Sequence, residues 1–175
     1  TTNNYGVAIL AVSGPWDLDG NPMQGEVIEI ANARKESYGG SGGKGYKPHR
    51  VEPATIEEDM ARRELTYNTL LWRLYDLVEG PDKKDILDLT GCGLKDLADG
   101  WMQCPSDPDK TFADDPTRML RIIKFGIRYD HDLTPDTLAA IRRQAPRLKE
   151  PPQNAIATIL IETLLVEPGW KKALT

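Results

Sequence analysis

The sequence predicts an α+β fold in which a short β-sheet region comes first and helices follow. Two apolar segments near the start, residues 5–12 and 27–31, are bounded by turn residues and have the length of buried strands. From Thr55 onward the pattern changes to helix-start signals followed by apolar residues at helical spacing. Because strands and helices do not alternate, the order favours an α+β arrangement over a parallel α/β sheet.

Loops and helix starts can be placed along the chain with some detail. The segment 37–47 contains five glycines and is expected to be a mobile loop. Thr55 followed by Glu58 has the pattern of a capping box, in which the two side chains satisfy each other's free backbone N–H groups. Cap residues, proline at first helical positions and apolar spacing predict further helices over residues 67–78, 115–129, 134–148 and 154–166.

Composition restricts the class of protein. The 175 residues are 39% hydrophobic and 28% charged, which is typical of a soluble protein with a real core, and no apolar run is long enough to cross a membrane. The only cysteines, Cys92 and Cys104, fit no zinc motif and are expected to be free thiols of a cytoplasmic protein. The net charge of −5 disfavours a general nucleic-acid binder, although basic residues concentrate at 44–50 and 118–128.

One predicted helix has a strongly basic face. Four cations fall within an arc of about 120° on the helix that follows Asp115, namely Arg118, Arg121, Lys124 and Arg128. This stripe is either a solvated surface or a phosphate-binding face, since arginine matches phosphate in a bidentate way. Asp115 and Arg118, one turn apart, either cap the helix or together offer an acceptor and donors to the edge of a base.

The segment around this helix carries a resemblance to a known family. Residues 114–125, DDPTRMLRIIKF, resemble the motif EDPxRxLRxxRF of class II tRNA nucleotidyltransferases (CCA-adding enzymes) and bacterial poly(A) polymerases. In that family the Asp and the first Arg select CTP and ATP, so the resemblance assigns these roles to Asp115 and Arg118. Arg121, on the same face, is included in the expected nucleotide site. Asp114 departs from the family by replacing Glu.

A second segment resembles the same family over sixteen residues. Residues 55–70, TIEEDMARRELTYNTL, resemble TIEEDLxRRDFTINAL. In the family the second Arg and the Asn line the triphosphate and sugar, and the acidic residue approaches the ribose. The resemblance therefore places Arg63, Glu64 and Asn68 at the nucleotide. Glu64 stands where the family has Asp, so its longer side chain puts the discrimination of the sugar in doubt.

Two weaker matches keep the family's order along the chain. Residues 28–36, IEIANARKE, resemble VEVTTFRxE, and residues 88–97, DLTGCGLKDL, resemble DPxGGxxDL. The resemblance then implies that residues 1–84 form the C-terminal part of a nucleotidyltransferase head, the remnant of its β-sheet, and that residues 85–175 form an all-helical neck.

The family transfers nucleotides with Mg²⁺ held by carboxylates on an Asp-x-Asp strand, and no such strand is recognisable before Glu29. We therefore expect a fragment, or one chain of a split enzyme whose missing carboxylates come from an upstream segment or a separate chain. Glu29 is the candidate accessory catalytic and metal-binding carboxylate; the alternative is an exposed strand position. The turn context of Asp17 and Asp19 favours local hydrogen bonding over metal binding.

The resemblance implies a template-independent RNA nucleotidyltransferase that uses ATP or CTP to extend the 3′ end of a tRNA or another RNA. CCA addition and polyadenylation stay open, because one motif serves both. The alternative is a non-catalytic nucleotide- or RNA-binding or assembly module descended from that family. Contacts with RNA are expected from the cations Arg34, Lys44, Lys47, Lys124 and Arg128. For Lys44 and Lys47, a role in solubility is the simpler interpretation.

Overall fold

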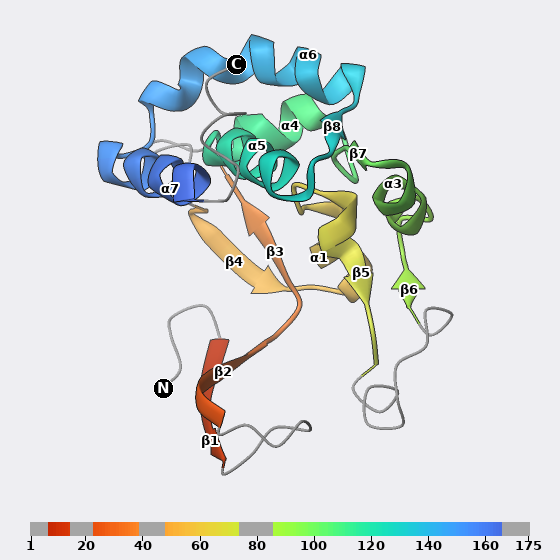
Figure 1. The fold of residues 1–175 in the computed structure, drawn as a ribbon, viewed down its shortest axis with the longest axis vertical. Helices are drawn as coiled ribbons and strands as arrows, with labels where there is room; N and C mark the ends of the chain where they lie inside the picture. Colours follow the sequence, from red (N-terminus) through yellow and green to blue (C-terminus); the bar gives the residue numbers. More distant parts are fainter. Residues whose placement is uncertain (1–6, 15–22, 39–47, 74–85, 166–175) are drawn as a thin grey trace.

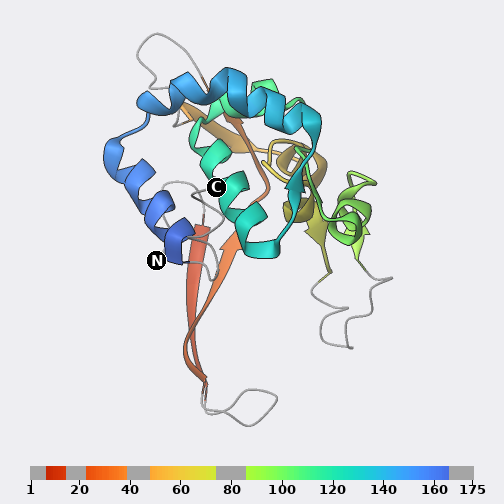
Figure 2. The ribbon, with the colours of Figure 1, turned by 45° about the horizontal axis from the view of Figure 1, so that its top comes forward.

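The computed structural model describes residues 7–14, 23–38, 48–73 and 86–165, and for 7–14 and 23–29 it describes the backbone alone. Strands β1 (Val7–Gly14) and β2 (Met23–Ala31) pair in antiparallel fashion and extend away from the helical part of the molecule (Figures 1 and 2). Both strands were expected from their apolar sequences, and both extend somewhat beyond the predicted bounds.

Strands β3 (Arg34–Ser37) and β4 (Arg50–Pro53) form a second antiparallel pair, which lies against the helices (Figure 1). The glycine-rich segment predicted to be a loop connects them, and its residues 39–47 lie outside the described residues. Both strands are short and do not form a broad sheet. They place a few side chains beside helix α5 (Thr117–Tyr129).

Helix α1 (Ile56–Ala61) begins with the predicted capping box. The hydroxyl of Thr55 accepts from the N–H of Glu58 at 3.2 Å, and the Glu58 carboxylate accepts from the N–H of Thr55 at 2.9 Å. Two of the otherwise unpaired amide groups at the helix start are thereby satisfied. This local signal needs no tertiary contact, which explains why the sequence alone located the start of the helix.

The predicted helix over 67–78 is wrong in its described part. Residues Thr66–Thr69 form a 3-10 turn, η1, and Leu70–Leu71 form strand β5, which pairs with β6 (Leu87–Asp88). The leucine-rich pattern favours a helix locally, but pairing with β6 holds the backbone extended from Leu70. Residues 74–78 lie outside the described residues.

The elements after β6 are mainly helical, and the helices from residue 108 onward gather above β3 and β4 in Figure 1. Helix α5 begins at Thr117, two residues inside the predicted range of 115–129, although the Asp115 carboxylate still accepts from the N–H of Thr117 at 2.9 Å. Thr134 caps its helix as predicted, and this helix ends in a 3-10 turn, η3. The elements are α3 (Gly93–Asp99), β7 (Trp101–Met102), α4 (Pro108–Asp114), α5, β8 (Asp132–Leu133), α6 (Pro135–Gln144), η3 (Ala145–Lys149) and α7 (Gln153–Leu165).

The core lies where α4, α5 and α6 meet the segment after α1. Helix α4 packs on α6, and α5 packs on α7. The buried core residues are Leu65, Met102, Phe112, Met119, Ile122, Ala140 and Ile141. Strands β1 to β4 precede the first helix, and only the two-residue strands β5, β6, β7 and β8 lie among the helices. The α+β fold class is confirmed. Among the described residues, no helix is long and apolar enough to span a bilayer.

Candidate functional site

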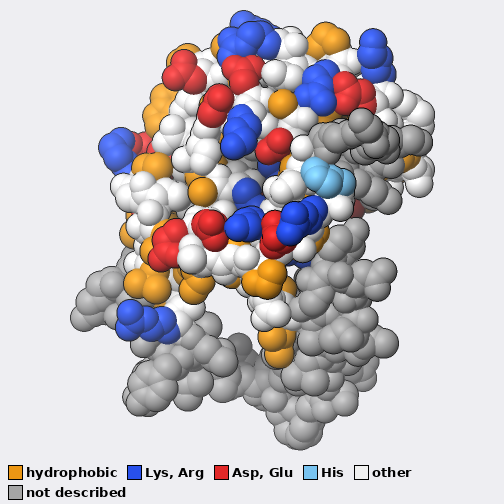
Figure 3. Space-filling view, turned by 180° about the vertical axis from the view of Figure 1, so that it is seen from behind, with side chains coloured by type: hydrophobic (Ala, Val, Ile, Leu, Met, Phe, Trp, Pro, Cys, Tyr) orange, Lys and Arg blue, Asp and Glu red, His pale blue; other side chains and the backbone are white. Residues whose placement is uncertain are grey.

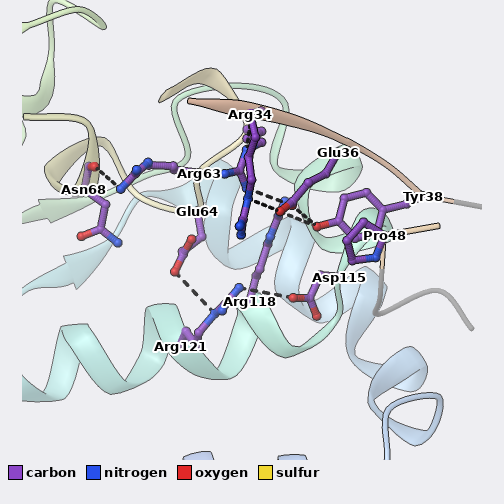
Figure 4. Close-up of a pocket in the computed structure, with 11 residues that line it drawn as sticks. Arg34, Glu36, Tyr38, Pro48, Arg63, Glu64, Asn68, Asp115, Arg118 and Arg121 are labelled. Atoms are coloured by element: carbon purple, nitrogen blue, oxygen red, sulfur yellow. Dashed lines mark hydrogen bonds and ion pairs between the residues drawn. The ribbon is translucent and has the colours of Figure 1, made fainter. Parts of the chain in front are cut away.

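A polar cleft of about 420 Å³ lies between strand β3, the segment that follows α1, and the beginning of α5 (Figure 4). Five arginines and three carboxylates contribute to its walls. The lining residues are Arg34, Glu36, Tyr38, Pro48, Arg62, Arg63, Glu64, Asn68, Asp115, Arg118 and Arg121. All six residues predicted to bind a nucleotide therefore lie around one cleft, although they come from two segments about fifty residues apart.

The end of helix α1 fixes two of the arginines through Asp59. This carboxylate is buried and accepts from the guanidinium groups of Arg62 and Arg63, at 2.5 and 2.9 Å, and from the N–H of Arg34 at 3.2 Å. Burial opposes ionisation of Asp59, but the hydrogen bonds from Arg62 and Arg63 outweigh it and hold its pKa below the usual value. The ionised carboxylate thus anchors Arg62 and Arg63 at the cleft wall.

Asn68 joins the same wall through the 3-10 turn that replaced the predicted helix. Its backbone carbonyl accepts from Nη1 of Arg63 at 3.1 Å, and its own N–H donates to the carbonyl of Leu65. The tight turn keeps Asn68 beside Arg63 in Figure 4. Because Leu65 is fully buried in the core, the turn is held at a fixed depth relative to the cleft.

The start of helix α5 provides a row of alternating charges. One oxygen of Asp115 accepts from the N–H and hydroxyl of Thr117, at 2.9 and 2.6 Å. Its other oxygen lies 3.3 Å from Nη2 of Arg121, whose Nε lies 3.4 Å from the Glu64 carboxylate. Glu64 and Asp115 are thereby held on either side of Arg121 (Figure 4).

Arg118 is the most buried of the cleft arginines, with 4% of its surface exposed. Its guanidinium donates to the carbonyl of Thr111 at 3.3 Å and to the hydroxyl of Tyr38 at 3.2 Å. The solvated-face interpretation of the basic stripe is therefore wrong at this position. A buried guanidinium is costly unless it is paired, and here these two acceptors and the Glu36 carboxylate, 3.9 Å from Nη2, pair it.

Some arginine N–H groups at the cleft lack a hydrogen-bond partner. Among the described residues, the buried Nε atoms of Arg63 and Arg118 have no hydrogen-bond partner, and that of Arg121 has only its 3.4 Å ion pair with Glu64. Buried polar groups are normally satisfied, and exceptions are frequent where a ligand completes the arrangement. The five guanidinium groups outnumber the three lining carboxylates and Asp59 behind the wall, and this positive excess suits an anionic ligand.

Four lining residues were not among the predicted site residues: Glu36, Tyr38, Pro48 and Arg62. Glu36 accepts from Nη1 of Arg62 and from the hydroxyl of Tyr38, at 2.9 and 2.6 Å. The available signal was the segment 28–36, which already carried a resemblance that ended at Glu36. Its contact with α5 depends on tertiary structure and has no counterpart in the sequence pattern.

The predicted RNA-binding residues are dispersed. Arg34 lines the cleft itself, while Lys124 pairs with Glu162 at 2.9 Å and the exposed Arg128 lies over the ring of Tyr129 at 5.8 Å. Lys44 and Lys47 lie outside the described residues. Seen from behind Figure 1, described side chains of both charge signs interleave over the surface (Figure 3), so on this face no broad basic area competes with the cleft for anions.

The described residues do not fit a metal site. Glu29 lies in β2 opposite Ile9, and its side chain is outside the described part, as are Asp17 and Asp19. Elsewhere in the described part, no three His, Cys, Asp or Glu side chains gather closely enough to hold a metal ion. The chemistry derived from the described residues is therefore ligand binding, without a step that passes through a metal.

The fold and cleft together define a protein with a mixed helix–strand scaffold and an arginine-rich cleft whose charge suits an anionic ligand. Comparison with known proteins then identifies its family. Residues 16–103 match the family described as the poly A polymerase head domain. The chain belongs to this family.

Relatives include two kinds of enzyme. The mitochondrial CCA tRNA nucleotidyltransferase of Saccharomyces cerevisiae is 33% identical over 66% of this chain and 19% of its own length. Poly(A) polymerase I of Escherichia coli O157:H7 is 34% identical over 66% of this chain and 23% of its own length. A solved tRNA nucleotidyltransferase, complexed with a primer tRNA and an incoming ATP analog, shares 28% identity and a TM-score of 0.55 over 68% of this chain and 33% of that chain.

The chain thus spans between about a fifth and a third of the length of these relatives. The family and fold expected from the sequence motifs are confirmed by these matches.

Proposed function

We propose that this chain provides the nucleotide-selecting site of a template-independent RNA nucleotidyltransferase, which uses CTP or ATP to extend an RNA 3′ end. The observation that supports this most is the convergence of all six predicted nucleotide-binding residues on one cleft. Two motif segments that are separate in the sequence supply them, and the cleft has an excess of guanidinium groups suited to phosphate.

Different residues of the cleft bind different parts of the nucleotide. Arg63, held by Asp59, binds the triphosphate, and Glu64 and Asn68 face the sugar. Asp115 and Arg118 take the base, because a fixed acceptor and fixed donors can read a Watson–Crick edge without a nucleic-acid template. Burial strengthens this discrimination, since a base with the wrong edge leaves buried polar groups unpaired.

The transfer step needs groups beyond the described side chains. We expect Mg²⁺ as the cofactor, with Glu29 as one carboxylate and the others supplied by an upstream segment or a separate chain. The RNA end is expected to meet Arg34, Lys44, Lys47, Lys124 and Arg128. Arg34 is the best placed of these, because it lies on the cleft wall beside the nucleotide site. The relatives include CCA-adding enzymes and a poly(A) polymerase, and both products remain within the proposal.

Equilibrium binding of CTP and ATP to the chain is the direct test. Arg118→Ala and Asp115→Ala are expected to weaken binding about tenfold or more, because each removes a partly or fully desolvated charged partner of the base. Arg143→Ala is the matched control: this exposed arginine pairs with Asp109 on α4 and lines no part of the cleft. Binding by both cleft variants at wild-type strength contradicts the proposal.

Incorporation of labelled CTP and ATP into a tRNA lacking its CCA end, with Mg²⁺, tests the reaction itself. The chain is assayed alone and with the Asp-x-Asp head segment of a CCA-adding enzyme added in trans. Incorporation that depends on Arg118 supports the enzyme. Arg118-dependent binding without incorporation in either assay supports the alternative of a non-catalytic nucleotide-binding module.

A further inference from the structure

Tyr38 connects the end of strand β3 to helix α5 across the cleft. Its hydroxyl donates to Oε2 of Glu36 at 2.6 Å and accepts from Nη2 of Arg118 at 3.2 Å. Its ring also lies against the same guanidinium, with the Arg118 carbon 5.5 Å from the ring centre. Figure 4 shows Glu36, Tyr38 and Arg118 close together at one end of the cleft. Tyr38 therefore contacts Arg118 through both its ring and its oxygen.

These contacts restrict how the Arg118 guanidinium can turn. On its other side, Nη1 donates to the carbonyl of Thr111 at 3.3 Å, so the two terminal nitrogens are held by different elements. A guanidinium is a planar fork of donors, and its orientation decides which acceptor pattern it matches. A rotation about the side-chain axis would present a different set of N–H groups to a base.

The hydroxyl of Tyr38 has a fixed direction because Glu36 takes its proton. Glu36 is 6% exposed at its side chain and lies 2.9 Å from Nε of Arg34 and 2.9 Å from Nη1 of Arg62. Burial raises the pKa of Tyr38 above its ordinary value, although Arg118 acts in the opposite direction. The phenol thus stays protonated at neutral pH and turns its lone pairs toward Arg118.

We propose that Tyr38 is a positioning residue that fixes the orientation of the Arg118 guanidinium and so sets which nucleotide bases the cleft accepts. The inference rests on the proposed function, because it assumes that Arg118 reads the base. It adds a residue outside the two motif helices, at the border of the glycine-rich segment. In this arrangement the residue that follows β3 affects which base is selected without contacting the base itself.

The test is Tyr38→Phe, which removes one oxygen and keeps the ring against Arg118. Dissociation constants for CTP, ATP, GTP and UTP give the discrimination ratio, and the variant is expected to lower it by about tenfold. Tyr67→Phe is the matched control: the Tyr67 hydroxyl bonds to the carbonyl of Trp101 and to His131, away from the cleft. The control is expected to keep the ratio of the wild type.

A double-mutant cycle separates positioning from a general structural role. If Tyr38 acts through Arg118, Tyr38→Phe has no further effect on the ratio in the Arg118→Ala background. An unchanged ratio in Tyr38→Phe, or an equal loss in both backgrounds, overturns the inference. Should Tyr38→Phe unfold, Glu36→Gln removes both the carboxylate that takes the Tyr38 proton and the 3.9 Å ion pair between Glu36 and Arg118, so the ratio is expected to fall; an unchanged ratio there overturns the inference.

Failure of this inference is distinguishable from failure of the proposed function. If the wild type binds neither CTP nor ATP, or if binding is insensitive to Arg118→Ala, the proposed function is wrong and the inference falls with it. If binding and selectivity depend on Arg118 but not on Tyr38, the proposed function stands and only the positioning role is refuted.

Discussion

Replacement of Asp59 by Asn is expected to loosen the cleft wall and lower the stability of the whole fold. Asn has nearly the same shape as Asp but lacks the charge and one of the two acceptor oxygens. Both oxygens of Asp59 are in use, one toward Arg62 and the other toward Arg63, with the N–H of Arg34 as an additional donor. The substitution therefore leaves at least one guanidinium without its carboxylate partner.

The size of the effect follows from burial. The Asp59 side chain is 6% exposed, while those of Arg62 and Arg63 are 23% and 39% exposed. Breaking a fully buried ion pair costs about 3–5 kcal/mol, and a hydrogen bond to a charged group contributes about 1.5–3 kcal/mol. Because water still reaches both arginines, we expect a loss of about 2–3 kcal/mol, or about 5–10 °C in Tm for a chain of this length.

Thermal unfolding at pH 7 and pH 3 measures this. The folded-state pKa of Asp59 is lowered, so its contribution is complete above the unfolded pKa of about 4 and is lost as the pH falls through the folded value. The difference between wild type and Asp59→Asn should therefore shrink at pH 3. Asp99→Asn, which affects an exposed pair with Lys95, is expected to change stability by less than about 0.5 kcal/mol. Equal effects of the two substitutions at pH 7 would refute the reasoning.

Three further predictions concern the core, the thiols and RNA. Phe112→Ala should lower the free energy of unfolding by about 3–5 kcal/mol in a denaturant titration, because Phe112 is fully buried. Burial raises the pKa of Cys104 to about 12, so at pH 8 an alkylating reagent should modify Cys92 faster, as peptide mass spectrometry would show; the opposite order contradicts this. Arg128→Ala should reduce the salt dependence of RNA binding by about one unit of slope while CTP affinity stays unchanged; a loss of CTP affinity would place Arg128 at the nucleotide.

Local signals predicted the parts of the fold that local interactions decide. The capping box at Thr55 and the cap at Thr134 each join a side chain to an amide three residues away, so the sequence window contains both partners. The prediction of a helix over 67–78 was wrong because the contact that decides this segment is not local. Strand β5 exists because Leu70 and Leu71 pair with residues 87–88, beyond the reach of any local propensity.

The sequence by itself determined the family and seven of the eleven residues that line the cleft, because motif spacing is a property of the chain alone. Only the tertiary structure decided how these residues meet. Arg118, one of four cations on a helix face, is buried because Tyr38, eighty residues away in sequence, packs against it. Burial and long-range hydrogen bonds arise when segments that are distant in the sequence pack together. This packing gives Arg118, whose position on its helix is ordinary, a specific orientation.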